Sequence, residues 1–241
     1  MTLIAGLRCS TGGVLICADR EESTSSSKRS VEKILRIALR QAVFVIAGAG
    51  CSSILANTFA RLADALKAAD EENGNDLFKT HQDIINAVLR SIYGEFVWGQ
   101  HEEEERKISL IISAAFRSPH SIPVLYGTDD DILYPEQLCA YAGIGEDLAY
   151  YFSDKLYHHT LTPKEVAFLA AFIFREVSRS VTGVGLGTDM RLLKEKNLAV
   201  VEIPVNKVKE IEDVVPSVAD AIIKAWNNGV QIPDWLETAF L

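Results

Sequence analysis

The order of patterned segments constrains the fold of this chain more than any other feature of its sequence. Apolar runs typical of strands and amphipathic stretches typical of helices follow one another as strands, a helix pair, strands, a second helix pair, strands and a last helix. Strands joined by short turns predict antiparallel sheets, and helix pairs that interrupt them predict helices on the outer sheet faces. A doubly wound parallel sheet fits poorly, because its strands alternate singly with helices.

The expected elements have the following bounds. Strands at 3–7 and 14–18 form a hairpin, and the polar, Ser-rich stretch 21–30 is expected to be a loop. Further strands are predicted at 33–39, 42–47, 107–116, 123–126, 139–143, 189–193 and 198–203, with a turn at 127–131. Helices are predicted at 52–69, 81–98, 146–158, 163–178 and 213–226, the fourth with Thr162 as its cap and Pro163 in its first turn.

Length and composition indicate a single packed domain. Of the 241 residues, 48% are hydrophobic and 24% are charged, and no Pro-, Gly- or Ser-rich linker divides the chain. We therefore expect one domain over residues 1–241, in the α+β class, with two sheets packed together between two helix layers.

Charge, hydropathy and cysteine usage exclude several classes of partner. Asp and Glu number 33 against 24 Lys and Arg, a net charge of −9, which disfavours binding to nucleic acid or to anionic lipid. No apolar run approaches the ~20 residues that span a bilayer, and the N-terminus lacks the layout of a signal peptide. The four cysteines show no pairing pattern, so we expect reduced thiols in a cytoplasmic protein.

Common motifs for metal binding, nucleotide binding and a serine nucleophile are missing from the sequence. It contains no HExxH, GxxxxGK[ST] or GxSxG motif, and no histidine pair has a helical metal-ligand spacing. The acidic triplet 129–131 is interpreted as a solvated turn, and the Gly-rich stretch 183–187 precedes a strand rather than opening a helix. We therefore expect neither a metal nor a cofactor.

Four residues near the start of the chain suggest a nucleophilic site. Thr2 follows Met1, and initiator methionine is generally removed before a small residue; Thr2 would then carry a hydroxyl nucleophile and an α-amine with a pKa of about 8 that acts as its base. Lys33 beside Asp19 would favour the charged state of that pair. The amide of Gly48, after an apolar strand, could stabilise an oxyanion. Each residue also has a structural interpretation: Thr2 as a strand residue, Asp19 and Lys33 as an ion pair, and Gly48 as a strand end.

The stretches that contain these residues resemble the opening of proteasome subunits, which are N-terminal-nucleophile (Ntn) hydrolases. They are Thr2-Leu-Ile-Ala-Gly-Leu-Arg, Gly13-Val-Leu-Ile-Cys-Ala-Asp-Arg, Ser30-Val-Glu-Lys-Ile and Val45-Ile-Ala-Gly-Ala-Gly. The resemblance is to the β-type, the bacterial or archaeal kind. It implies a four-layer αββα sandwich and a homo-oligomeric ring. It also implies a threonine-type catalytic site of Thr2, Asp19, Lys33 and Gly48 that acts on peptide or protein substrates.

The second half of the chain departs from the pattern of active β-type subunits. Gly143-Ile144-Gly145 stands where active members have Gly-Ser-Gly, and Arg175-Glu176 begins the stretch where they have Arg-Asp-x-x-Ser-Gly-Gly. Glu176 and Thr182 are alternative substitutes for the missing carboxylate and hydroxyl.

Three functions follow from these features. The first is a threonine-type peptidase or amidohydrolase that works through an acyl-enzyme. The second is a non-catalytic ring or scaffold subunit, which the lack of an N-terminal extension disfavours. The third is a peptide ligase or transpeptidase in which an amine replaces water on the same acyl-enzyme.

Overall fold

The computed structural model describes residues 2–23, 28–73, 77–101, 103–117, 122–195, 198–214 and 220. Within them the strands form two five-stranded antiparallel sheets, of order β10-β1-β2-β11-β12 and β5-β6-β7-β8-β9, and the two-stranded ribbon β3-β4. In chain order the strands are β1 Leu3–Arg8, β2 Val14–Asp19, β3 Glu21–Ser23, β4 Lys28–Ser30, β5 Ile34–Ala38, β6 Ala42–Gly50, β7 Ile108–Phe116, β8 Val124–Asp129, β9 Ile132–Glu136, β10 Cys139–Gly143, β11 Thr188–Leu193 and β12 Val200–Ile203. The helices are α1 Ser52–Asn73, α2 Leu77–Phe96, α3 Glu103–Arg106, α4 Glu146–Leu156, α5 Pro163–Ser180 and α6 Val205–Val214.

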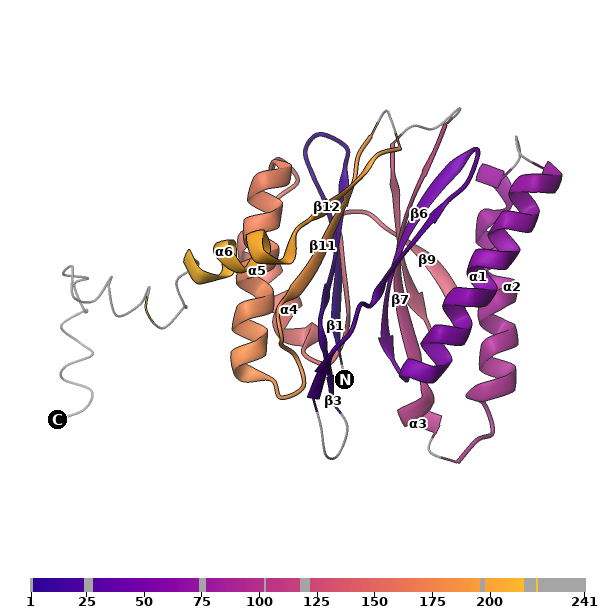
Figure 1. Ribbon diagram of the computed structural model, residues 1–241, viewed down its shortest axis with the longest axis horizontal. Coiled ribbons are helices and arrows are strands. Elements are labelled where there is room, and N and C mark those ends of the chain that lie inside the picture. Colours follow the sequence, from indigo (N-terminus) through magenta and orange to yellow (C-terminus); the bar gives the residue numbers. More distant parts are fainter. Residues whose placement is uncertain are drawn as a thin grey trace, which may run out of the picture.

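The two large sheets lie face to face, and helices cover their outer faces (Figure 1). Helices α1 and α2 lie on the sheet that contains β6 and β7, and α4 and α5 lie on the sheet that contains β1 and β11. The predicted α+β class and the antiparallel sheets are thereby confirmed. Within the described part of the chain, no helix combines the length and apolar composition that crossing a bilayer requires.

The side chains of the central strands divide between two cores, because successive residues of a strand point to opposite faces of its sheet. In β1, Leu3 and Leu7 pack under α4 and α5, whereas Ile4 faces the other sheet. In β6, Phe44 packs under α1 and α2, whereas Val45 faces the first sheet. Both faces of these strands are therefore buried, which explains their continuous apolar sequences.

A glycine in β1, Gly6, allows the two sheets to approach each other closely. A Cβ added at Gly6 would lie 2.6 Å from Leu125 Cδ1 and 2.8 Å from Ile111 Cγ2, both on the opposite sheet. The glycine thus lets the sheets approach closely where the N-terminal strand crosses the other sheet.

Several predicted boundaries are confirmed. The hairpin of β1 and β2 forms as expected, and the Thr162 side chain caps α5 in a capping box with Glu165, with Pro163 in the first turn. The start of α2 was predicted four residues too late: the helix begins at Leu77, whose side chain is buried in the core.

Other predictions are wrong. The expected loop 21–30 contains β3 and β4. The expected turn 127–131 is shorter than predicted, because residues 127–129 belong to β8 and the turn is formed by Asp130 and Asp131 before β9 begins at Ile132. Strand β9 was not predicted, because Pro135 argues against a strand in the sequence. Strand β9 lies at the edge of its sheet, where the missing N–H of a proline is tolerated. Helix α6 was not predicted, because its sequence is mainly polar. It is held in place by tertiary packing, since its buried Val208 packs against the core under α5. Most of the predicted helix 213–226 lies outside the described residues.

Candidate active site

Asp19 ends β2 as a buried carboxylate surrounded by donors. Its side chain is 1% exposed. Oδ1 accepts hydrogen bonds from Leu3 N and Lys33 Nζ, each at 3.0 Å. Oδ2 accepts from Glu21 N at 3.1 Å and from Gly185 N at 3.3 Å. Burial raises the pKa of Asp19, and the Lys33 ammonium and the backbone amides oppose that shift by stabilising the carboxylate.

Lys33 lies just before β5, and its ammonium is buried with Asp19. The residue is 8% exposed, and Nζ donates to Asp19 Oδ1 and, at 2.5 Å, to the Glu21 carbonyl oxygen. The pair predicted from the sequence therefore exists as a direct ion pair of 3.0 Å. A buried pair of this kind needs further hydrogen bonds to offset its desolvation, and the backbone around Asp19 supplies them.

Thr2 is held on both sides by the backbone around it. It is 5% exposed, its carbonyl oxygen accepts from Ile144 N at 2.9 Å, and the next amide, Leu3 N, donates to Asp19. Gly143 has a φ of 95°, and a Cβ there would collide with the Thr2 carbonyl oxygen. The Gly143-Ile144 segment therefore positions the Thr2 backbone through main-chain contact rather than through a hydroxyl side chain. Met1 lies outside the described residues.

Gly48 lies in β6, and its amide already has a partner. Gly48 N donates to the Lys33 carbonyl oxygen at 3.1 Å. A Cβ at Gly48 would lie 2.7 Å from Leu55 Cδ2, so the glycine also lets α1 approach the strand. The structure thus links Gly48 to Lys33, with its N–H directed at a backbone carbonyl in this conformation.

The Gly-rich segment 183–187 supplies a contact that the sequence interpretation missed. It connects α5 to β11, and Gly185 N is one of the donors to Asp19 Oδ2. Its composition was the available signal, since a run with alternate glycines lets a backbone amide approach an anion closely. Here the anion is a carboxylate of the same chain.

Glu176 and Thr182, the two alternative substitutes for the missing carboxylate and hydroxyl, lie in different places: Glu176 in α5 and Thr182 after it. Glu176 pairs with Arg179 at 3.0 Å. Thr182 lies in the turn that follows α5. Arg175, next to Glu176, donates to the backbone carbonyl of Glu212 in α6.

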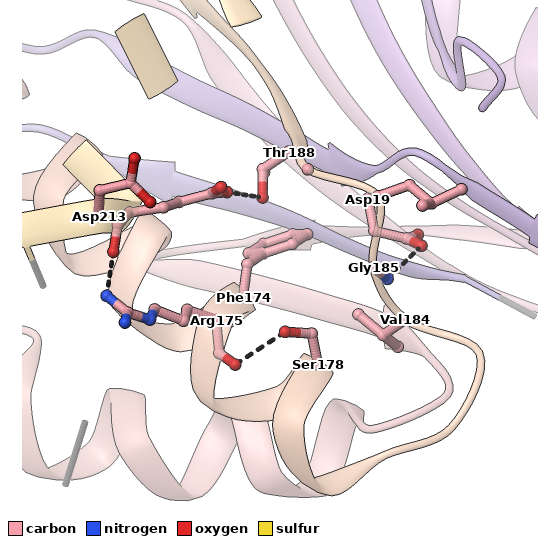
Figure 2. Close-up of a pocket in the computed structure, with 11 residues that line it drawn as sticks. Asp19, Phe174, Arg175, Ser178, Val184, Gly185, Thr188 and Asp213 are labelled. Carbon is pink, nitrogen blue, oxygen red and sulfur yellow. Dashed lines mark hydrogen bonds between the residues drawn. The ribbon is translucent and has the colours of Figure 1, made fainter. Parts of the chain in front are cut away.

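A cavity of about 200 Å³ adjoins Asp19 on the side of α5 and α6. Figure 2 shows Asp19 and Gly185 at one end of it, and Arg175 and Ser178 of α5 at the other. Thr188 lines it too, and its hydroxyl donates to Glu212 Oε1 at 2.8 Å. The remaining lining residues are Phe174, Val184, Leu186, Gly187, Glu212 and Asp213.

The acidic triplet 129–131 is partly neutralised by bases. Asp131 pairs with Arg90 at 3.4 Å and Asp130 with Lys107 at 3.7 Å. Among the described residues, no group of three His, Cys, Asp or Glu side chains is arranged to hold a metal ion.

Comparison with solved structures reveals the same fold in other proteins. The Anbu protein (ancestral beta-subunit) from Yersinia bercovieri matches with a TM-score of 0.75 and 10% identity, over 95% of this chain and 100% of that one. An Anbu (Gly-1) mutant from Hyphomicrobium sp. strain MC1 matches with a TM-score of 0.74 and 14% identity, over 96% and 99%. The Anbu complex from Pseudomonas aeruginosa, solved as a helical assembly, matches with a TM-score of 0.74 and 11% identity, over 96% and 98%.

Comparison with family models and with curated proteins finds no match. The attribution to proteasome β-type subunits is wrong, because the structures reported above are Anbu proteins, a distinct family with a proteasome-like fold. At identities of 10–14%, what this chain shares with the Anbu structures is their fold.

Proposed function

We propose that this protein is a threonine-type peptidase or amidohydrolase of the Ntn kind, with a four-layer αββα arrangement and Thr2 as its nucleophile. The observation that carries the proposal is the Asp19 carboxylate, which binds Lys33 Nζ and the amide that follows Thr2 through one oxygen atom. This arrangement brings a buried cation to the N-terminal strand. A cation near an amine lowers the pKa of that amine and so keeps it available as a base.

The proposed reaction starts once Met1 has been removed. The Thr2 hydroxyl oxygen attacks the carbonyl carbon of an amide, and its proton passes to the Thr2 α-amine. The C–N bond then breaks, the leaving nitrogen takes that proton, and an ester links the acyl group to Thr2. Water hydrolyses the ester, which restores the hydroxyl and releases a carboxylic acid. The Gly48 amide serves as the oxyanion donor if it turns from the Lys33 carbonyl towards the substrate.

A non-catalytic role is the second candidate, and one observation favours it. The Gly48 N–H is engaged with the Lys33 carbonyl at 3.1 Å, so the oxyanion site is not preformed. A ligase or transpeptidase would use the same acyl-enzyme with an amine as the acceptor, and product analysis with added amine distinguishes it from a hydrolase.

Covalent labelling tests the proposed nucleophile. Intact mass is expected to show loss of Met1, and a peptide epoxyketone is expected to add one inhibitor mass, located on Thr2. Thr2→Ser should retain labelling because it keeps a hydroxyl, whereas Thr2→Ala should lose it. Thr11→Ala, at an exposed threonine of the β1–β2 turn, is the matched control and should label like the wild type. Retention of Met1, or equal labelling of Thr2→Ala, would overturn the proposal.

We further propose a homo-oligomer in a reducing, cytoplasmic location. The P. aeruginosa Anbu complex forms a helical assembly. In this chain α4 and α5 expose Tyr151, Leu156 and Phe168, which supports association through that face. All four cysteines are free thiols, as in proteins of reducing compartments. Electron microscopy of the purified protein distinguishes the predicted ring from a helical filament.

A further inference from the structure

Arg20 follows Asp19 directly; its main chain contacts the Gly-rich segment 183–187, and its side chain contacts Asp189 just after that segment. Arg20 N donates to the carbonyl oxygens of Gly185 at 3.2 Å and Gly187 at 3.0 Å. The guanidinium donates from Nη1 to Asp189 Oδ1 at 2.6 Å, just beyond the segment. One residue therefore holds both ends of the loop that brings the Gly185 amide to Asp19.

The backbone of this loop includes a residue in an unfavourable conformation. Leu186 has a φ of 56°, in the left-handed region that a branched side chain rarely adopts, and its side chain is exposed. Gly187 follows with a φ of 90°. A segment with this backbone persists only where its surroundings hold it. The burial of Val184 and the contacts of Arg20 with Gly185 and Gly187 are among the interactions that do so here.

The Asp189 carboxylate is largely buried and accepts a hydrogen bond from the Arg20 guanidinium. The residue is 9% exposed, Oδ1 binds Arg20, and Oδ2 is buried without a hydrogen-bond partner among the described residues. A buried carboxylate with one unsatisfied oxygen is costly, and the paired guanidinium is what offsets that cost. The register of β11 on β2, with Thr188 opposite Asp19 and Asp189 opposite Ala18, places this pair beside the loop.

We infer that Arg20 and Asp189 are positioning residues that hold the Gly185 amide against Asp19 and so keep the Asp19–Lys33 pair in its reactive arrangement. This inference rests on the proposed function, since it concerns the same site. The two residues touch neither Thr2 nor the Lys33 ammonium through any contact described above; they act through the loop. Loss of the Gly185 donor removes one stabilising contact from the carboxylate, so the pKa of Asp19 is expected to rise.

The test is the pH dependence of labelling by a peptide epoxyketone in Asp189→Asn, which removes the charge but keeps the shape. We expect the labelling rate near neutral pH to fall about 3-fold to 10-fold. We also expect the acidic limb of the rate profile to move up by about 0.5 to 1 pH unit. Hydrogen exchange of the peptide that contains Gly185 should become faster in the variant. Asp189→Glu, which keeps the carboxylate, should restore part of the rate.

Ser30→Ala is the matched control, because it removes the other partner of the same guanidinium. Arg20 Nε donates to Ser30 Oγ at 2.9 Å, in an exposed contact away from the loop. Its profile is expected to match that of the wild type. Should Asp189→Asn fail to fold, Arg20→Gln changes the more exposed partner of the pair and is expected to give the same upward movement of the acidic limb.

The outcomes separate the two proposals. If the wild type labels and both Asp189→Asn and Arg20→Gln keep its profile, the positioning role is wrong while the proposed function stands. A lower rate with an unmoved acidic limb would indicate general destabilisation and would also overturn the positioning role. If the wild type itself does not label, the proposed function fails, and the inference that rests on it fails with it.

Discussion

Lys33 is the cation that accompanies a buried carboxylate, and its removal would leave Asp19 without a charged partner. The two side chains are 9% and 1% exposed. Breaking a buried ion pair from one side costs about 3 to 5 kcal/mol, because the remaining charge stays desolvated. Lys33→Met is therefore expected to lower the free energy of unfolding by about that amount and to abolish labelling of Thr2. Lys207→Met, at an exposed pair with Glu210, is the control and should change stability by less than about 0.5 kcal/mol.

The cost of Lys33→Met should depend on pH with a defined sign. Burial already raises the pKa of Asp19, and loss of the ammonium raises it further. A carboxyl whose pKa is raised by folding favours the folded state at low pH, and that benefit is lost as pH rises through the folded pKa. Urea unfolding should therefore show a smaller difference between variant and wild type at about pH 4.5 than at about pH 7.5. An equal difference at both pH values would argue against an ionised Asp19.

At the scale of elements, a chain of hydrogen bonds through His81 ties α2 to β8. Gln82 Nε2 donates to the Tyr126 hydroxyl at 3.0 Å, and that hydroxyl lies 2.9 Å from His81 Nε2. His81 Nδ1 lies 2.7 Å from the Phe78 carbonyl oxygen, which can only accept. The neutral ring therefore carries its proton on Nδ1, and Tyr126 donates to Nε2.

This network predicts acid sensitivity. Burial lowers the pKa of His81, so the neutral ring is the form that folding favours. The stabilisation is complete above the unfolded pKa of about 6.5 and is lost as pH falls below it, because the unfolded chain takes up the proton first. Between about pH 7.5 and pH 5.5 the free energy of unfolding should fall by about 1 kcal/mol more in the wild type than in His81→Gln. His158→Gln, at an exposed histidine, should retain the wild-type slope.

At the scale of the whole molecule, the outer face of α4 and α5 carries an apolar groove. It has a volume of about 550 Å³ and is lined in part by Leu156, Leu161, Phe168 and Phe172. Leu156 and Phe168 are nearly half exposed in the single chain. Exposed apolar clusters of this kind mark surfaces that associate.

If the proposed homo-oligomer forms through this groove, a charged residue within it should dissociate the oligomer. Phe168→Asp places a charge in the groove and is expected to reduce the mass measured by light scattering towards that of one chain, at about 10 μM protein, with the fold unchanged by circular dichroism. Ile132→Asp, at an exposed residue of the edge strand β9, is the control and should leave the oligomer intact. A stable oligomer in Phe168→Asp would place the interface elsewhere.

Local sequence was sufficient for much of the fold. The apolar runs of β1, β2 and β6 predict strands, and Thr162 followed by Pro163 predicts the start of α5, because each signal depends on neighbours within a few residues. The short polar strands β3 and β4 were not predictable in this way, and neither was α6. Strands β3 and β4 are stabilised by pairing with each other, and α6 is stabilised by packing on the core under α5. Neither kind of contact produces a recognisable pattern of residues along the segment.

For the candidate site, the sequence by itself determined the residue types and their places along consecutive strands: Thr2 before β1, Asp19 at the end of β2 and Lys33 before β5. Only the tertiary structure decided how they are held. Gly185 reaches Asp19 across 166 residues, Arg20 reaches Asp189 across 169, and the Gly48 amide is directed at Lys33. The physical reason is that strand periodicity specifies which face a side chain occupies. The partner of a backbone amide depends instead on where separate loops and sheets meet.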